Sequence, residues 1–326
     1  MATGRLVRGV RSAGIVVVAA ILGLAAVGAL YTPNTTIPPG SAGTTLTVAG
    51  TPLRIVQAGK GRDLLLIHGS PGSVEDWEPI ITALSESFHV VAYDRPGHGY
   101  SGDTGEYSFE HNADVALAVV EALHLDHVVV AGHSYGGSTA LAVAEHASPR
   151  TDAFVIVDSA TYTPSRRVEP SLRILTMPLV GMGFASVIGP LIAPGRMRRG
   201  LREVFAGHEV SEDFIEQRLR IWNCPKVSHS TAAETVGAAE GLRALSAGYA
   251  HIVKPVVIVA EADSEFRRTT AEHLHRDIAG SSLHLVSDTG HMIQFQKTGD
   301  VVAAIREAAQ MSAPGPAAAN PSGPPN

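Results

Sequence analysis

Short apolar segments and longer amphipathic segments follow one another along most of this chain. The short segments are continuous apolar runs, the pattern of strands covered on both faces of a sheet. Alternation with helical patterns predicts an α/β fold, a mostly parallel sheet flanked by helices. The expected strands are Asp63–Ile67, Phe88–Tyr93, His127–Ala131, Ala153–Val157, Pro255–Ala260 and Ser282–Val286, preceded by a hairpin of Thr44–Val48 and Leu53–Ala58. The expected helices are Asp76–Ser87, Tyr107–Leu123 and Val301–Gln310.

The N-terminal segment has a different pattern. Ser12–Tyr31 is apolar throughout and follows three arginines, Arg5, Arg8 and Arg11. Its length suits a bilayer crossing, which takes about 20 residues. The arginines predict that the N-terminus is cytoplasmic and that the remaining chain lies outside the cytoplasm. We prefer an uncleaved membrane anchor; the alternative is a signal peptide cleaved near Val27–Ala29, which would give a secreted or periplasmic protein.

The strand and helix rhythm breaks between residues 161 and 251. Within this insertion, Ile174–Gly195 carries no charge, but prolines and glycines interrupt it, so broken apolar helices are expected rather than a second membrane span. Arginines frame the segment, namely Arg166, Arg167, Arg173, Arg196, Arg198, Arg199 and Arg202. They could rest on an anionic membrane surface, or they could be solvated charges around a lipophilic helical layer. Either interpretation favours an apolar substrate.

These patterns divide the chain. We expect an anchor or signal peptide at 1–31, a linker at 32–45, a core at 46–160 and 252–311, a helical insertion at 161–251 and a disordered Pro/Ala-rich tail at 312–326. A length of 326 residues favours one enlarged domain over two equal ones. The net charge of −6 argues against nucleic acid as a partner. Cys224, the only cysteine, has no partner for an intramolecular disulfide.

The first chemical motif is the sequence Gly132-His-Ser-Tyr-Gly136. It has the G-x-S-x-G spacing of a nucleophile elbow and lies between a buried strand and a helix-compatible run. Glycines are needed there because the backbone at the serine is strained and neighbouring Cβ atoms would collide. Ser134 is the predicted nucleophile.

The second motif, His68-Gly-Ser-Pro-Gly72, follows the buried strand that ends at Ile67. Backbone N–H groups fixed around a carbonyl oxygen stabilise the negative charge that develops during acyl transfer. We predict the N–H groups of Ser70 and Tyr135 as this oxyanion hole.

A serine nucleophile needs a base that accepts its proton, and histidine suits this role. The chain has 15 histidines, so position must choose among them. His291 follows the last expected strand, which in a parallel sheet ends at the same edge as the strand before Ser134. His68, His98 and His133 are interpreted as structural residues of the loops around the pocket.

Three motifs together resemble the α/β-hydrolase family, in its capped esterase-, C–C-hydrolase- and epoxide-hydrolase-like branch. They are His68-Gly-x-Pro-Gly, Asp94-x-x-Gly-x-Gly-x-Ser101 and Gly132-x-Ser-x-Gly136, and the resemblance covers Leu46–Ser159 and Lys254–Gln310. It implies that residues 161–251 form a mobile helical cap over the pocket. It also implies that His291, in its Gly-His pair, is the base, and that Asp94, Arg95 and His98 shape their loop rather than react.

The resemblance implies that a carboxylate orients His291. Asp263, after the penultimate strand, occupies the usual place and is our preferred acid. Asp158, at the end of the preceding strand, is the rival, because some members carry the acid there; Glu261 is a third candidate.

The resulting hypothesis is a membrane-anchored serine hydrolase acting on a small apolar ester, with no metal or organic cofactor. A C–C bond hydrolase of aromatic breakdown and a non-catalytic binding protein at the membrane remain as alternatives. Relatives that hydrolyse epoxides attack with an aspartate, so Ser134 disfavours that activity.

Overall fold

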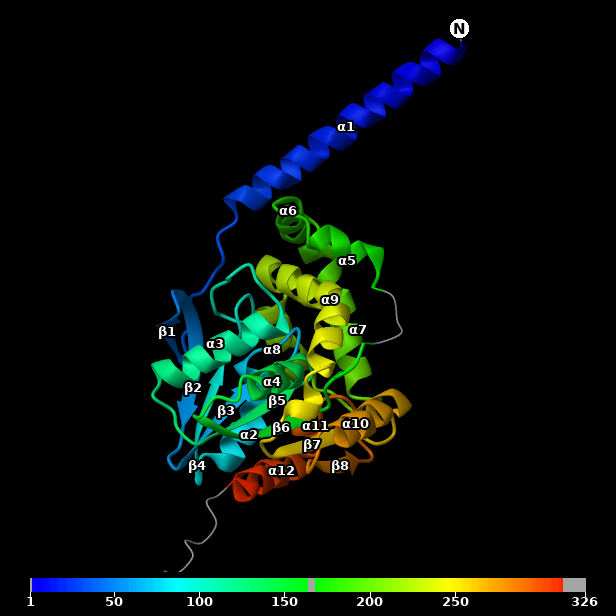
Figure 1. The fold of residues 1–326 in the computed structure, drawn as a ribbon. Helices are drawn as coiled ribbons and strands as arrows, with labels where there is room; N and C mark the ends of the chain where they lie inside the picture. The colour runs from blue at the N-terminus through cyan, green and yellow to red at the C-terminus, as the bar shows by residue number, and fades with distance from the viewer. Residues whose placement is uncertain (1, 164–167, 313–326) are drawn as a thin grey trace, which may run out of the picture.

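The computed structural model describes residues 2–163 and 168–312 (Figure 1). One eight-stranded sheet organises the molecule, in the order β1-β2-β4-β3-β5-β6-β7-β8. β1 pairs with β2 and β2 with β4 in antiparallel fashion, and all remaining pairs are parallel. The strands are β1 (Thr44–Val48), β2 (Thr51–Ala58), β3 (Arg62–Ile67), β4 (Phe88–Tyr93), β5 (Val128–His133), β6 (Thr151–Val157), β7 (Val256–Glu261) and β8 (Ser282–Val286). The predicted mostly parallel sheet is confirmed.

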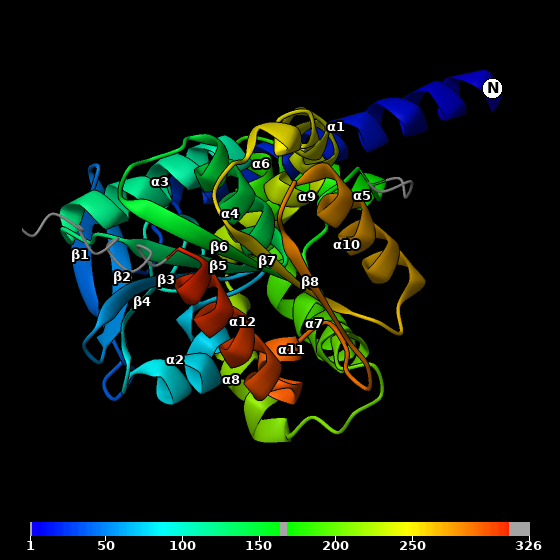
Figure 2. The same ribbon diagram turned by 60° about the horizontal axis from the view of Figure 1, so that its bottom comes forward.

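Side chains of the central strands alternate between two buried layers. In β3, Leu65 and Ile67 join one apolar cluster, whereas Leu64 and Leu66 join the other. The first cluster includes residues of α3 (Phe109–Ala122), α4 (Tyr135–Glu145) and α10 (Glu265–Asp277), and the second includes residues of η1 (Val74–Trp77), α2 (Glu78–Leu84), α11 (Ile293–Gln296) and α12 (Thr298–Met311). Figure 2 shows α3 and α4 on one face of the sheet and α2 and α12 on the other. Burial on both faces explains the continuous apolar runs.

In the described residues, five α-helices lie between β6 and β7, within the stretch whose composition differs from the core. They are α5 (Pro170–Leu175), α6 (Val180–Val187), α7 (Gly189–Val204), α8 (Glu212–Trp222) and α9 (Pro225–Ser246), and the short η2 (Tyr249–His251) leads back to β7. A separate apolar cluster, which includes Leu201, Ile215 and Trp222, holds α7, α8 and the start of α9 together. We call residues 161–251 the helical insertion.

Two buried ion pairs tie the helical insertion to the core. Arg95, after β4, contacts Glu234 of α9 at 2.5 Å, and Asp76 of η1 contacts Arg218 of α8 at 3.0 Å. All four side chains are almost fully buried. Removing one member of such a pair would leave an uncompensated charge inside the protein, so these contacts fix where α8 and α9 sit.

The chain begins with a long helix, α1 (Ala2–Leu30), which projects from the body of the molecule (Figure 1). Its segment Arg11–Leu30 is long and apolar enough to cross a membrane, and it is almost entirely exposed. A signal sequence would satisfy the same criteria, so both earlier interpretations stay open. Apart from Ser312, the predicted disordered tail lies outside the described residues.

Candidate active site

Ser134 stands at a tight turn between β5 and α4. Its backbone has φ 54° and ψ −120°, a strained conformation for a residue with a side chain. A Cβ on Gly132 would lie 2.0 Å from the carbonyl oxygen of Gly136, and a Cβ on Gly136 would lie 2.2 Å from that of Ile67. Glycine is therefore required at both positions, and the turn holds the serine hydroxyl at the sheet edge.

The imidazole of His291 lies between Ser134 and a carboxylate. His291 Nε2 is 3.0 Å from Ser134 Oγ, and its Nδ1 is 2.6 Å from Asp158 Oδ2. His291 comes from the loop between β8 and α11, whereas Asp158 follows β6 directly. When the Nδ1–H group of His291 donates a hydrogen bond to the Asp158 carboxylate, Nε2 is unprotonated and can accept the proton of the serine hydroxyl. This is the arrangement of a catalytic nucleophile, base and acid.

The prediction that Asp263 orients His291 is wrong. Asp263 Oδ2 instead accepts a hydrogen bond from the backbone N–H of Asp288 at 2.7 Å, which shapes the loop that leads to His291. Strand order alone does not separate the two acids, because β7 lies between β6 and β8, the strand before His291. They differ in side-chain contacts, since the Asp158 carboxylate reaches His291 Nδ1 and the Asp263 carboxylate is occupied by the N–H of Asp288. The rival, Asp158, is thus the acidic residue that contacts the histidine. Glu261, the third candidate, contributes only its backbone N–H, 3.0 Å from Asp158 Oδ1.

An arginine that the sequence did not single out completes this cluster. Arg267 of α10 places Nε 3.3 Å from Asp158 Oδ2 and donates from Nη1 to the Asp158 carbonyl oxygen at 2.8 Å. Burial would raise the pKa of Asp158, but the hydrogen bond from His291 and the charge of Arg267 outweigh it and lower that pKa. Burial, and then Arg267, lower the pKa of His291. Both groups are thereby kept in the forms that the reaction needs, a carboxylate and a neutral imidazole.

His133 and His68 have structural contacts. The ring of His133 packs against that of His291, with centroids 4.5 Å apart, and its Nε2 lies 2.9 Å from the His291 carbonyl oxygen. Burial and the neighbouring His291 lower the pKa of His133 to about 3, so it is neutral and donates this hydrogen bond. His68 accepts the backbone N–H of Arg95 at 2.8 Å. These contacts fix the loops on either side of Ser134.

The loop after β3 passes directly beside the serine. A Cβ on Gly69 would lie 3.1 Å from Ser134 Cβ, so only glycine lets the loop approach this closely without displacing a neighbour. This places Ser70 at the cavity, which Gly69, Ser70 and Ser134 all line. Among the residues that the structure describes, the Ser70 hydroxyl is buried without a hydrogen-bond partner. The oxyanion-hole role of the Ser70 and Tyr135 N–H groups stays a prediction.

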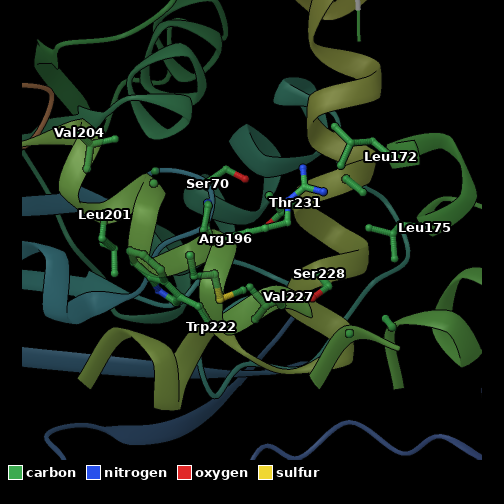
Figure 3. A pocket seen from close by; sticks show the side chains of 18 of the residues that line it. Ser70, Leu172, Leu175, Arg196, Leu201, Val204, Trp222, Val227, Ser228 and Thr231 are labelled. Atoms are coloured by element: carbon green, nitrogen blue, oxygen red, sulfur yellow. The ribbon is translucent and has the colours of Figure 1, made fainter. Parts of the chain in front are cut away.

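Ser134 and His291 face a cavity of about 450 Å³. Its other walls are mostly apolar side chains of the helical insertion. Figure 3 shows Leu172 and Leu175 on one side and Leu201 and Val204 on the other, with Val227 between them. Such a site would hold a lipophilic group beside the serine.

Potential metal ligands do not gather at this cavity in the described part of the chain. The one cluster of suitable composition there consists of Glu110, Asp114 and His146, which are exposed and lie outside the cavity lining. His146 is 3.1 Å from Glu110, and an ion pair accounts for this contact.

Several known proteins are similar to this chain. A putative esterase/lipase of Haemophilus influenzae is 21% identical over 260 residues, covering 74% of this chain and 81% of that protein. The 2-hydroxymuconate semialdehyde hydrolase of Pseudomonas sp. is 27% identical over 266 residues, covering 78% and 89%. Some other matches span only 40% of the relative. The crystal structure of Cfl2 from Burkholderia cenocepacia has a TM-score of 0.70 at 21% identity, covering 85% of this chain and 99% of that one.

The family assignment rests on the match to a family model. The sequence model of the alpha/beta hydrolase family matches residues 64–305, which run from within β3 through β8 and include the serine turn and the loop that carries His291. The predicted resemblance is confirmed, and the protein belongs to the alpha/beta hydrolase family.

Proposed function

We propose that this protein is a serine hydrolase that cleaves an apolar ester through an acyl-enzyme on Ser134. The observation that carries the proposal is the placement of His291, 3.0 Å from the serine hydroxyl and 2.6 Å from the Asp158 carboxylate, beside an apolar cavity. A serine hydroxyl is a weak nucleophile alone, and a base held at this distance activates it.

The proposed reaction has two steps. Ser134 Oγ attacks the ester carbonyl carbon while His291 Nε2 takes its proton, and Asp158 stabilises the resulting imidazolium. The N–H groups of Ser70 and Tyr135 would then stabilise the negative oxygen of the tetrahedral intermediate. Its collapse expels the alcohol, which takes the proton from His291. A water molecule activated by His291 releases the acid and restores the serine.

Labelling with a fluorophosphonate probe tests this proposal, because the probe reacts only with an activated serine. We expect full-length protein to be labelled, and Ser134→Ala and His291→Ala to lose labelling completely. The same proteins are then assayed with p-nitrophenyl esters of increasing chain length. An unlabelled, well-folded wild type with no esterase activity would overturn the proposal in favour of a binding protein for a hydrophobic ligand.

A second candidate is hydrolysis of a carbon–carbon bond. It is favoured by the similarity over 78% of the chain to a 2-hydroxymuconate semialdehyde hydrolase. The serine, histidine and carboxylate arrangement suits either reaction. Parallel assays with a ring-fission dienone acid and with esters discriminate them, and we expect the ester to have the higher kcat/KM because the cavity lining is so apolar.

Location at a membrane belongs to the same proposal. Arg11–Leu30 would cross the bilayer with its arginine-rich end in the cytoplasm, which leaves the hydrolase domain outside. Membrane fractionation with protease protection tests it, and a soluble protein without the first 30 residues would support cleavage instead.

A further inference from the structure

Large exposed apolar side chains gather on one part of the helical insertion. Outside α1, ten are exposed in the described residues, and six of these lie between residues 174 and 192. We call these six the α5–α7 apolar surface: Ile174, Met177, Leu179, Val187, Leu191 and Ile192, whose exposed fractions run from 42% to 79%. On soluble proteins, a cluster of exposed apolar side chains of this kind marks an interaction site.

The end of α1 packs against the same helices. Gly28 of α1 is buried, and a Cβ there would lie 1.9 Å from the carbonyl oxygen of Leu179. A Cβ on Gly183 of α6 would likewise lie 1.8 Å from the carbonyl oxygen of Leu24. The two backbones are therefore in direct contact, as small residues permit between membrane helices. In Figure 1, α5 and α6 lie between α1 and the sheet.

Two residues of the α5–α7 apolar surface also line the cavity. Ile174 and Ile192 line the cavity and are at the same time 42% and 47% exposed. Phe184 and Ala185, on α6, line it as well. One layer of helix thus separates the outer apolar surface from the space beside Ser134.

Three of the arginines beside this surface, Arg196, Arg198 and Arg202, already have carboxylate partners, whereas Arg173 and Arg199 have none among the described residues. Arg198 pairs with Glu212 and Glu216, and Arg202 also pairs with Glu212. Residues 174–195 carry no charge. The chemistry of that segment is apolar, which matches acyl chains rather than lipid phosphates.

We propose that α1 is retained and that the α5–α7 apolar surface is immersed in the bilayer leaflet on the side of the hydrolase domain, so that the cavity is loaded with lipophilic substrate from the membrane. The occupant of this surface is the lipid bilayer, because a helix long enough to span it ends in backbone contact with α6. The docking part is independent of catalysis, whereas the loading part rests on the proposed ester hydrolysis.

Fluorescence quenching in vesicles tests the docking. Full-length protein with Cys224→Ser receives one cysteine, Leu191→Cys or the control Val253→Cys, which are 79% and 88% exposed in the native chain. Each is labelled with an environment-sensitive fluorophore and reconstituted into phosphatidylcholine vesicles. We expect brominated acyl chains to quench the probe at position 191 and aqueous iodide to quench that at 253. Equal iodide quenching at both positions would overturn the proposal.

Intact-mass analysis of the membrane-bound protein tests the retention of α1. We expect the uncleaved mass in wild type. Gly28→Leu and Gly183→Leu should loosen the contact between α1 and α6 and increase iodide quenching at position 191. The controls Gly23→Leu and Gly189→Leu should not, because a Cβ at either glycine meets nothing within 4 Å. A mature chain that begins after Gly28 would refute retention.

Substrate loading is tested by comparing two esters. Leu191→Glu should lower kcat/KM several-fold for a long-chain ester dissolved in vesicles and leave that for a short water-soluble ester unchanged. Val253→Glu should alter neither. An equal effect of Leu191→Glu on both esters would contradict loading from the membrane. Absence of turnover with either ester in wild type would count against the proposed function, while the quenching result would still decide the docking.

Discussion

At the scale of single residues, the site depends on which carboxylate reaches His291. Asp158, which follows β6 directly with a backbone φ of 46°, places Oδ2 2.6 Å from His291 Nδ1. Asp263, after β7, instead holds the loop that leads to His291 by accepting the backbone N–H of Asp288. The two aspartates therefore act on the same histidine in different ways, one on its ring and one on its loop.

This difference predicts unequal effects of matched substitutions. Asp158→Asn should lower kcat by roughly three to four orders of magnitude. The imidazolium would lose the negative charge that stabilises it, and His291 would no longer be held in the tautomer with its proton on Nδ1. Asp263→Asn should lower kcat by less than about tenfold, since it changes only the hydrogen bond that holds the loop leading to His291. Steady-state ester hydrolysis measures both, with circular dichroism as the check on folding. Comparable losses in the two variants would contradict the assignment.

Arg267 predicts a pH effect. Its positive charge lowers the pKa of His291, so Arg267→Gln should raise that pKa. The base must be neutral to accept the serine proton, so the acid limb of the kcat/KM profile should move to higher pH. Relative activity is then lost on the acidic side and kept on the alkaline side. The neighbouring exposed Arg268→Gln is the control and should leave the profile in place.

Sequence reasoning reached Ser134, His291 and both candidate acids, but it preferred Asp263, whereas Asp158 is the acid that contacts His291. Ser134 is fixed by local backbone requirements that leave a glycine pattern in the chain. The choice between Asp158 and Asp263 depends instead on where each carboxylate points after its strand ends, and the order of the elements along the chain does not give that direction. Arg267 left no signal because it is one of two adjacent arginines on an ordinary helix.

At the scale of elements, the buried ion pairs decide how the helical insertion meets the sheet. Arg95 forms an ion pair with Glu234 of α9 and donates a hydrogen bond to Asn112 Oδ1 of α3 at 3.1 Å. Its guanidinium carbon also lies 4.6 Å from the centroid of the Tyr135 ring. The pKa of Glu234 is held at about 2, because Arg95 and His98 outweigh the effect of burial. One carboxylate therefore joins α9 to the loop after β4 and, through Arg95, to the residue beside the nucleophile.

Neutralising the Glu234 carboxylate should lower the free energy of unfolding. Glu234→Gln leaves Arg95 buried with reduced compensation, and breaking such a pair typically costs about 3–5 kcal/mol of unfolding free energy. The control Glu212→Gln removes an exposed partner of Arg198 and Arg202 and should cost less than about 1 kcal/mol. Denaturant unfolding in detergent measures both. A cost for Glu234→Gln no larger than that of the control would refute the structural role of this pair.

At the scale of the whole molecule, the apolar cavity sets a limit on substrate size. The cavity of about 450 Å³ lies between a rigid floor, made by β5, the loop after β3 and the histidine loop, and walls from the helical insertion. The floor could be predicted because parallel strands deliver their loops to one edge. The walls could not, because broken helices with proline and glycine carry no periodic pattern from which their packing follows.

Chain-length dependence tests the size limit. In wild type, kcat/KM should rise with acyl length until the cavity is filled and then fall. Ala232 of α9 lines the cavity and is buried, so Ala232→Leu should shift the optimum to shorter acyl chains. The acetate ester serves as the internal control and should be hydrolysed at nearly the wild-type rate. An unchanged optimum would place the acyl group elsewhere.

The two ion pairs of the insertion have a consequence for how this protein can diversify. Both attach α8 and α9 to the core, whereas the described salt bridges of α5–α7 stay within the helical insertion. Away from the contact with α1, substitutions in α5–α7 should therefore lower the free energy of unfolding less than substitutions at the ion pairs of α8 and α9. New substrate preferences can therefore arise through changes in α5–α7, while the ion pairs of α8 and α9 maintain the fold.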